Sequence, residues 1–388
     1  MKRTSELIRR IFMKQGWFTI PNAILLFISV SIFSICIWKQ YPDIPIHNEF
    51  VHEVHLGEKT LPVHFLYFLI LLLPELLFKS IKAVNIFSVI ILSVCVLFKY
   101  RVVRNIFSEE LSIDAPGKRV PDFVLLMPLL LMICENLIYK PSATMFLGYL
   151  PVNTWHNSTT IFLMPFALLL FYRSYQYVLN PGKKLLIEIL VLVCLNLVIK
   201  PSFLLCFVPV FPLFALLSSG WSKRTFASGA ISLLAIAGLY LQTVIGKYSG
   251  STDVNARIAP FNVWAHWGMN IPLAFICSVF FPLLFLVFYP GLLKKERLLK
   301  YSWMLFLTGT VIFILLSESG VREYDGNFAW QVIICNFMLF LATALAFGKH
   351  LQSTGAVTMK DKWIAGVLVL HFLTGCLYLL KSPMFDFR

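Results

Sequence analysis

Charged residues are scarce in this chain, and their scarcity excludes most soluble folds. Asp, Glu, Lys and Arg make up 13% of the 388 residues, while hydrophobic residues make up 59%. A typical soluble domain has about 25% charged and roughly 45–50% apolar residues. Mean hydropathy is +0.79. The sequence therefore predicts an integral membrane protein and leaves no room for a separate soluble domain of the P-loop or Rossmann type.

Cysteine motifs are also absent. All eight cysteines lie within apolar runs, and none of them forms a CxxC motif. Metal sites and disulfide frameworks use recognisable cysteine spacings, so we interpret these residues as small core side chains. His52 and His55 have helical spacing but lack a second ligand pair. No metal and no cofactor is therefore predicted, and a divalent metal is kept only as a minor alternative.

In place of charge, the chain has apolar runs long enough to cross a hydrocarbon core of about 30 Å. About eleven runs predict membrane-spanning helices, at residues 17–38, 83–98, 121–139, 158–178, 185–199, 202–218, 226–245, 271–290, 301–317, 329–347 and 363–380. We therefore expect an all-α, polytopic membrane protein in which residues 1–388 form a single transmembrane domain.

A further apolar run, residues 61–78, is assigned differently because of the charges that follow it. If it crossed the membrane, the basic segment 99–120 would fall outside and every later loop would be inverted. Pro74 and Glu75 also interrupt its apolar character. We expect an interfacial or re-entrant helix here, within a first outer loop that covers residues 39–82.

The distribution of the net charge of +14 sets the expected orientation. With residues 61–78 kept outside, the predicted cytoplasmic segments hold twice as many Lys and Arg residues as the outer segments, whose charges balance. This is the positive-inside pattern. It predicts a multi-pass protein of a plasma membrane, such as the bacterial inner membrane, with residues 1–14 retained in the cytoplasm. Membrane lipid is the expected partner of the basic side, and no nucleic-acid partner is predicted.

The predicted outer segments hold most of the polar and aromatic residues outside the spans, so a functional site is expected on that side. The first of these segments contains Asp43, His47, Glu49 and His64. One interpretation is an amphipathic interfacial helix with a wet face. The other is a general base surrounded by groups that orient it and bind substrate.

The order of features in about the first 110 residues resembles the GT-C superfamily of polytopic glycosyltransferases, of the protein mannosyltransferase and lipid A aminoarabinose transferase kind. The counterparts are a first span, then Asp43 with His47 and Glu49, then LPVHFLY at 61–67, then a span that ends with FKYR at 98–101. The resemblance implies an enzyme that transfers a sugar from a polyprenyl-phosphate donor to an acceptor at the outer face. It also implies that Asp43 is the catalytic carboxylate, with Glu49 as the second candidate.

A repeated motif supplies the predicted phosphate ligands. NLxxKPS occurs at residues 136–142 and 196–202, and it places Lys140 and Lys200 directly before a proline at the outer end of two spans. Proline disfavours helix at the preceding residue, so each lysine is expected where a helix breaks. There its ammonium can bind a lipid phosphate. Snorkelling of a lysine to the membrane interface is the alternative.

Three further outer segments contribute to the predicted binding site. Together with His47 and His64, the residues expected to contact donor or acceptor there are Trp155, His156, Asn157, His266, Glu318, Arg322, Asp325 and Asn327. An arginine near hydrocarbon is costly unless it is paired or binds an anion, which favours a role for Arg322. An aromatic belt and a helix N-cap are the alternative interpretations of Trp155 and Asn157.

The sequence thus favours glycosyl transfer to a carbohydrate or lipid acceptor, for assembly of surface polysaccharide or glycolipid, and two alternatives stay open. A polysaccharide polymerase or ligase would use a polyprenyl-diphosphate glycan, but it typically has arginine-rich outer loops, which this chain lacks. A transporter or lipid flippase would have ionisable residues at the bilayer midplane and matching broken helices.

Overall fold

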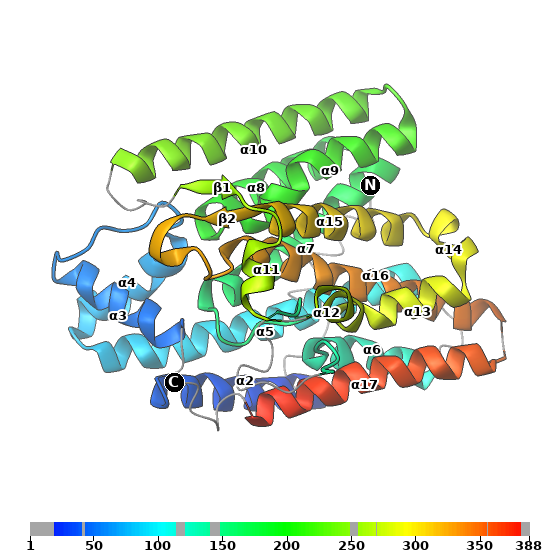
Figure 1. The fold of residues 1–388 in the computed structure, drawn as a ribbon, viewed down its shortest axis with the longest axis horizontal. Coiled ribbons are helices and arrows are strands. Elements are labelled where there is room, and N and C mark those ends of the chain that lie inside the picture. Colours follow the sequence, from blue (N-terminus) through cyan, green and yellow to red (C-terminus); the bar gives the residue numbers. More distant parts are fainter. Residues whose placement is uncertain are drawn as a thin grey trace.

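The fold of this chain is almost entirely helical (Figure 1). The computed structural model describes residues 19–40, 43–113, 121–139, 148–248, 255–268, 270–354 and 356–381. Within these ranges the strands are β1 (Ala256–Ile258) and β2 (Leu316–Glu318), which pair antiparallel. The all-α, polytopic character expected from the sequence is confirmed at this level.

The helices follow the apolar runs closely. They are α2 (Ile20–Trp38), α3 (Ile44–His55), α4 (Leu66–Phe78), α5 (Ile81–Leu111), α6 (Asp122–Ile133), α7 (Ser158–Leu179), α8 (Lys183–Ile199), α9 (Ser202–Ser219), α10 (Lys223–Tyr248), α11 (Asn262–His266), α12 (Ile271–Ser278), α13 (Phe280–Phe288), α14 (Pro290–Lys295), α15 (Arg297–Leu315), α16 (Trp330–Thr354) and α17 (Met359–Lys381), with the 3-10 turns η1 (Gly320–Arg322) and η2 (Asn327–Ala329).

The expected count of about eleven spans is not confirmed. In the described part of the chain, eight helices are long and apolar enough to cross a membrane, or up to nine if the bent pair α12 and α13 forms one span. The difference lies in α6 and α8. Helix α6 has 12 residues, or about 18 Å of rise, and α8 has 17 residues that include three charged side chains.

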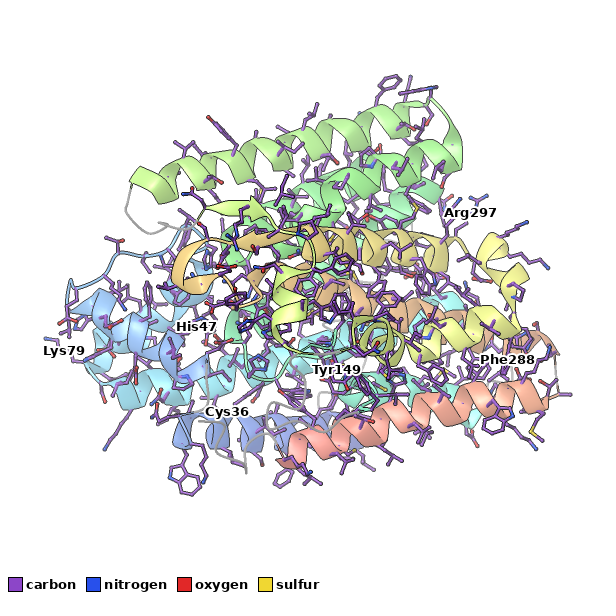
Figure 2. All side chains as sticks on the ribbon, in the orientation of Figure 1. Cys36, His47, Lys79, Tyr149, Phe288 and Arg297 are labelled. Atoms are coloured by element: carbon purple, nitrogen blue, oxygen red, sulfur yellow. The ribbon has the colours of Figure 1, made fainter. Side chains whose placement is uncertain are left out.

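The long helices run roughly along one common direction and define two ends of a bundle, while short helices such as α11 and α12 cross that direction (Figure 1). At one end lie α3, α4 and the β1–β2 ribbon, and we call this the site end. At the opposite end lies α14. Figure 2 shows His47 and Lys79 at the site end and Phe288 and Arg297 at the opposite end.

Helix α4, the segment assigned to an interfacial position from the sequence, lies at the site end beside the start of α5. The Tyr67 hydroxyl and Ser88 Oγ are 3.0 Å apart, and His52 of α3 hydrogen-bonds Glu75 of α4 at 2.7 Å. With 13 residues, α4 spans about 20 Å, too short to cross the bilayer unless it is distorted.

Helix α16 is the core of the bundle. Its candidate membrane span is buried along the whole window, and it packs against α5, α6, α7, α9, α13 and α15. Because these neighbours cover it on every side, α16 has no face exposed to lipid. Side chains on α16 therefore face the interior at every depth, including the site end.

Helices α6 and α5 correct two boundaries expected from the sequence. The predicted span 121–139 stops being helical after Ile133, and the buried Glu135 follows in extended backbone. The predicted span 83–98 instead continues as one helix to Leu111, so Lys99, which was expected in the cytoplasm, lies buried in the middle of α5.

Buried side chains satisfy the irregular backbone that follows α6. Val152 N donates to Glu135 Oε2, and Asn153 Nδ2 donates to the carbonyl oxygens of Leu131 and Cys134. Non-helical backbone at membrane depth requires such partners, because no water is present to replace them. A second interruption, the 76° bend between α12 and α13, lies next to it, since Leu137 N donates to Cys277 O.

Candidate functional site

Asp43 stands at the N-cap of α3, immediately after the first span. Its backbone angles are φ 75° and ψ −57°, a region that residues other than glycine rarely occupy. Pro45 occupies the first turn of the helix, where its fixed φ suits helix initiation. The chain therefore reverses sharply at Asp43, and its carboxylate is directed back towards the bundle, where it meets Asn157.

Asn157 connects the candidate base with the candidate phosphate ligand. Its Nδ2 donates to Asp43 Oδ2 at 2.7 Å, and its Oδ1 accepts a hydrogen bond from Lys200 Nζ at 3.0 Å. The same Oδ1 caps α7 by accepting from Thr160 N at 2.9 Å. The N-cap interpretation of Asn157 is thus correct, and the same side chain also hydrogen-bonds Asp43 and Lys200.

Lys200 is partly buried although it carries a formal charge. Residue 200 is the C-cap of α8, with extended angles of φ −170° and ψ 116° before Pro201, as the proline rule predicted. Its ammonium donates to Thr159 Oγ1 and Thr160 Oγ1 and lies 4.4 Å from the centroid of the Trp330 ring. Burial lowers the pKa of Lys200 to about 7, although the Asp43 carboxylate acts to raise it.

Two histidines complete the surroundings of Asp43. His47 Nδ1 lies 2.5 Å from Ser158 Oγ, at the start of α7. Burial lowers the pKa of His47 to about 4, against the effect of Asp43 and assisted by Lys200. Burial is the main cause that lowers the pKa of His64 to about 4, and the charges of Lys200, His47 and Arg322 add to the effect. Both imidazoles are therefore neutral at pH 7 and can exchange hydrogen bonds with a substrate.

His156 and Trp155 lie on the inner side of the same group. His156 Nδ1 is 3.3 Å from the Tyr378 hydroxyl, and its ring centroid is 5.9 Å from that of Trp330. Burial lowers the pKa of His156, and the charges of Asp43 and Lys200 also act on it. Trp155 is buried against Phe33 of α2. The six residues Asp43, His47, His64, His156, Asn157 and Lys200 are called the Asp43 cluster below.

The segment around β2 and η1 borders this cluster. Arg322 Nε lies 3.2 Å from Asp325 Oδ2 and 3.7 Å from Glu318 Oε2, and about half of the Arg322 side chain is exposed. Asn327 Nδ2 donates to Glu318 Oε2 at 2.6 Å. Trp330 Nε1 in turn donates to Asn327 Oδ1 at 3.4 Å, so this segment is joined to the ring that covers Lys200.

Some predicted residues are not brought into the cluster. Glu49 is exposed on α3, and none of its described neighbours forms a hydrogen bond or ion pair with it. His266, the last residue of α11, instead stacks on Tyr324 with ring centroids 3.7 Å apart. Lys140 falls outside the described residues. Among the residues of the described ranges, no group of three or more His, Cys, Asp or Glu side chains is placed to hold a metal ion.

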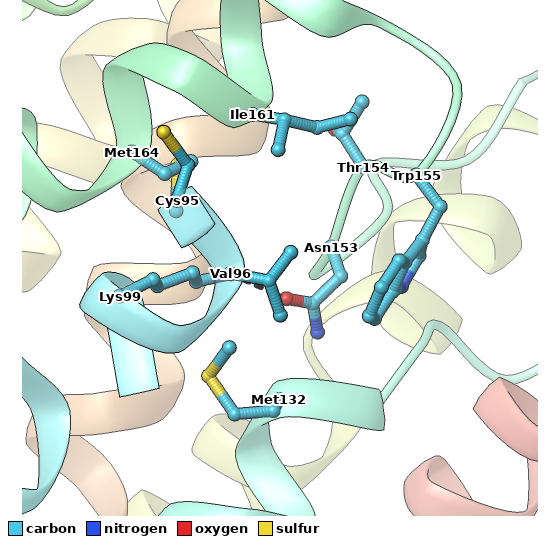
Figure 3. A pocket seen from close by; sticks show the side chains of 9 residues that line it. All are labelled: Cys95, Val96, Lys99, Met132, Asn153, Thr154, Trp155, Ile161 and Met164. Carbon is cyan, nitrogen blue, oxygen red and sulfur yellow. Dashed lines mark hydrogen bonds between the residues drawn. The ribbon is translucent and has the colours of Figure 1, made fainter. Parts of the chain in front are cut away.

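The sequence reasoning missed a second polar group, deeper in the bundle. Lys99 Nζ donates to Asn153 Oδ1 at 2.5 Å and lies 3.5 Å from the centroid of the Phe337 ring. Figure 3 shows Lys99 and Asn153 beside a small cavity. In the sequence, Lys99 directly follows an apolar run, a position that predicts the start of a cytoplasmic loop.

Comparison with protein-family models, with curated proteins and with solved structures finds no match for this chain.

Proposed function

We propose that this protein transfers a glycosyl group from a polyprenyl-phosphate donor to an acceptor hydroxyl at the site end of the bundle. The observation that carries the proposal is the double contact of Asn157, which holds a carboxylate and a partly buried ammonium at one place. Glycosyl transfer from a lipid phosphate needs these two groups, a base for the acceptor and a cation for the leaving phosphate.

The proposed step assigns one role to each group. The acceptor oxygen attacks the anomeric carbon, the bond between that carbon and the phosphate oxygen breaks, and polyprenyl phosphate leaves with the bonding electrons. Asp43 Oδ1 takes the acceptor proton, because Oδ2 is already held by Asn157. No cation of the described residues lies within ion-pair distance of this carboxylate. Lys200, with Arg322 nearby, stabilises the phosphate charge.

The order of elements supports the resemblance to GT-C enzymes. One span, α2, is followed by Asp43, by the two short helices α3 and α4 at the site end, and by the long helix α5. His47, which precedes the LPVHFLY run, and His64, which lies within it, are both within electrostatic reach of Lys200. We therefore keep Asp43 as the proposed base, and Glu49, exposed on α3, as the weaker candidate.

The charges of the connections support an outward-facing site. The opposite end carries the basic connections between helices, among them Lys183, Lys184, Lys223, Arg224, Lys294, Lys295 and Arg297. Positive charge marks the cytoplasmic side, so we assign the site end to the outer face of a plasma membrane. Surface polysaccharide and glycolipid assembly are the processes that require transfer there.

Replacing Asp43 by Asn tests the proposal directly. The Asn side chain keeps the size of Asp43 and an oxygen for the Asn157 N–H, but it cannot accept the proton. Transfer of labelled sugar from a polyprenyl-phosphate donor to membrane acceptors should fall by about 10²–10⁴, while protein level and donor binding persist. Glu53→Gln on the same helix is the matched control, because Glu53 pairs only with the exposed Lys59.

Glu49→Gln and the Asp43→Asn/Glu49→Gln double variant complete the test. Loss of transfer only in Glu49→Gln would move the base to Glu49. Full transfer in both single variants and in the double variant would reject glycosyl transfer by this cluster.

A specific observation keeps a transporter as the second candidate. Helix α6 stops at Ile133, α12 bends into α13, and the buried ionisable residues Glu135 and His371 meet between these interruptions, where Glu135 N donates to His371 O. Broken helices around buried ionisable groups are typical of transporters. If the protein is a transporter, Glu135→Gln should stop lipid-linked sugar from crossing the membrane of proteoliposomes, and Asp43→Asn should not. If it is a glycosyltransferase, Asp43→Asn should stop sugar transfer, and Glu135→Gln should not.

A further inference from the structure

A cavity lies directly below the Asp43 cluster, one level deeper in the bundle. It has a volume of about 10 Å³ and is lined by residues of α5, α6, α7 and the segment 153–155, including Lys99, Asn153 and Trp155 (Figure 3). This volume is close to the minimum for one oxygen-sized occupant. Ile161 and Met164 of α7 also line it, and Ile161 directly follows Thr160, which bonds Lys200.

The polar groups around the cavity are rich in donors and poor in acceptors. Lys99 Nζ has three N–H groups, of which one donates to Asn153 Oδ1 and the face of Phe337 covers another side. Trp155 Nε1 is buried and has no hydrogen-bond partner among the residues that the structure describes. The amide nitrogen of Asn153 donates its own N–H groups to Leu131 O and Cys134 O. Such a site suits an occupant that accepts hydrogen bonds and carries negative charge.

No carboxylate of the described residues neutralises Lys99 by direct contact. Glu135 is the nearest acidic side chain that acts on it electrostatically, but its Oε2 accepts from Val152 N, its Oε1 has no partner, and the two charges are not within ion-pair distance. A buried charge without a direct counter-charge is expensive. An anionic group beside Lys99 would offset part of this cost.

The two lysines lie over rings of the same helix. Lys200 lies over Trp330 and Lys99 over Phe337, and these two residues are seven positions apart on α16, which corresponds to about 10 Å along the helix axis. This axial offset is of the order of one monosaccharide with a charge-assisted hydrogen bond of about 2.8 Å at each side.

We propose that the cavity receives a carboxylate oxygen of the sugar, so that the preferred donor is a polyprenyl phosphate carrying an acidic sugar such as a uronic acid. This inference rests on the proposed function: Lys200 binds the phosphate, Lys99 binds the carboxylate, and the sugar ring lies between them beside Asn153 and Asn157. Each of these asparagines already accepts a hydrogen bond from one of the lysines. Met132 and Met164, whose unbranched side chains adapt easily, line the part of the cavity that must widen for the rest of the carboxylate.

Direct binding of two donors tests the inference without knowledge of the acceptor. Polyprenyl phosphate carrying glucuronic acid and the same lipid carrying glucose are bound to the purified full-length chain in lipid nanodiscs. Because a hydrogen bond to a charged group contributes about 1.5–3 kcal/mol, the wild type should prefer the acidic donor by about ten-fold or more. Lys99→Met should remove this preference and leave affinity for the glucose donor unchanged.

Control variants separate a binding role from a structural one. Lys82→Met, an exposed position on the same helix, should keep the wild-type preference. If Lys99→Met does not fold, the double variant Lys99→Met/Glu135→Gln replaces it in the measurement, because it removes one positive and one negative charge together. The double variant should show the same loss of preference for the acidic donor. Lys200→Met should weaken both donors equally.

The possible failures are distinguishable. Equal binding of both donors by the wild type, with both weakened in Lys200→Met, would overturn the acidic-sugar inference and leave the proposed function standing. An equal loss of both donors in Lys99→Met would make Lys99 structural and also overturn the inference. Binding of neither donor by the wild type would reject the proposed function itself.

Discussion

Asp43 and Lys200 are placed by local backbone features, of which that of Asp43 is costly and that of Lys200 is not. A non-glycine residue at φ 75° costs on the order of 1–3 kcal/mol, and Asp43 adopts this angle at the turn from α2 into α3. Lys200 is extended because Pro201 prevents helix at this position. The hydrogen bond from Asn157 Nδ2 to the Asp43 carboxylate is one contact that offsets part of the cost at Asp43.

The lowered pKa of Lys200 has a consequence for donor binding. With a pKa of about 7, the ammonium is charged at pH 6 and mostly neutral at pH 8, whereas His47 and His64, each with a pKa of about 4, stay neutral throughout this range. An anionic phosphate requires the charged form, so binding should be accompanied by proton uptake at higher pH.

We therefore predict that affinity for a polyprenyl-phosphate donor falls by roughly ten-fold between pH 6 and pH 8, since each pH unit above a pKa removes about nine-tenths of the remaining charged form. The measurement is the dissociation constant of the donor across this range. Lys200→Met should bind weakly with a flat profile between these pH values. A wild-type profile that stays flat would show that Lys200 does not titrate there or does not bind the phosphate.

Among the elements, the contact between α6 and α17 depends on a single glycine. A Cβ atom built on Gly375 would overlap the carbonyl oxygen of Ile133, the residue at which α6 ends. The backbone of α17 therefore approaches the broken end of α6 closely, and His371 on the same helix hydrogen-bonds the Glu135 carbonyl with its Nδ1 at 2.6 Å.

Gly375→Ala should lower the free energy of unfolding by about 1–3 kcal/mol or more, the usual cost of overpacking a filled interior. Gly366→Ala on the same helix is the matched control, because nothing lies within 4 Å of the added Cβ. It should leave stability unchanged or raise it by up to about 1 kcal/mol. The check is thermal unfolding in detergent, and equal stability of the two variants would contradict the close packing of α6 on α17.

The elements also show what sequence patterns determine and what they leave open. Hydropathy located most helices because an apolar run must be buried in lipid or protein whatever its partners are. Hydropathy gave the wrong structure at Glu135 and Lys99, because partners from other elements determine it there. The backbone of Glu135 bonds His371 and its carboxylate accepts from Val152 N. Lys99 contacts Asn153 and the ring of Phe337. No local pattern encodes those contacts.

The candidate site, too, could be predicted from the sequence only in part. Sequence position singled out Asp43, Asn157 and Lys200 because each lies at a helix end next to a span. The hydrogen bonds that join them link residues more than 40 positions apart. The roles of Trp330 as the cover of Lys200 and of Ser158 as the partner of His47 appear only in the folded arrangement.

At the scale of the whole molecule, the helix ends alternate between the site end and the opposite end. Contacts at the opposite end join the ends of helices that are distant in sequence: Lys349 of α16 binds both Glu110 of α5 and Glu296 beside α15, and Arg224 of α10 donates to the last carbonyls of α7. Helix α8 joins the two ends between Lys183 and Lys200, whereas α6 ends at Ile133, beside the middle of α5, where Lys99 and Asn153 lie.

This arrangement predicts a specific labelling pattern for single cysteines placed in a background without the native ones. Positions 80 and 257 lie at the site end, and positions 184 and 294 lie in connections of the opposite end. If the site end faces outward, a membrane-impermeant thiol reagent should modify Ser80→Cys and Arg257→Cys in intact cells. Lys184→Cys and Lys294→Cys should react only after permeabilisation, because the basic end stays in the cytoplasm. Modification of Ser80→Cys and Arg257→Cys only from the cytoplasmic side would mean that the site end faces the cytoplasm. In that case the orientation of the whole bundle reverses, and the Asp43 cluster could not act on an outer-face acceptor.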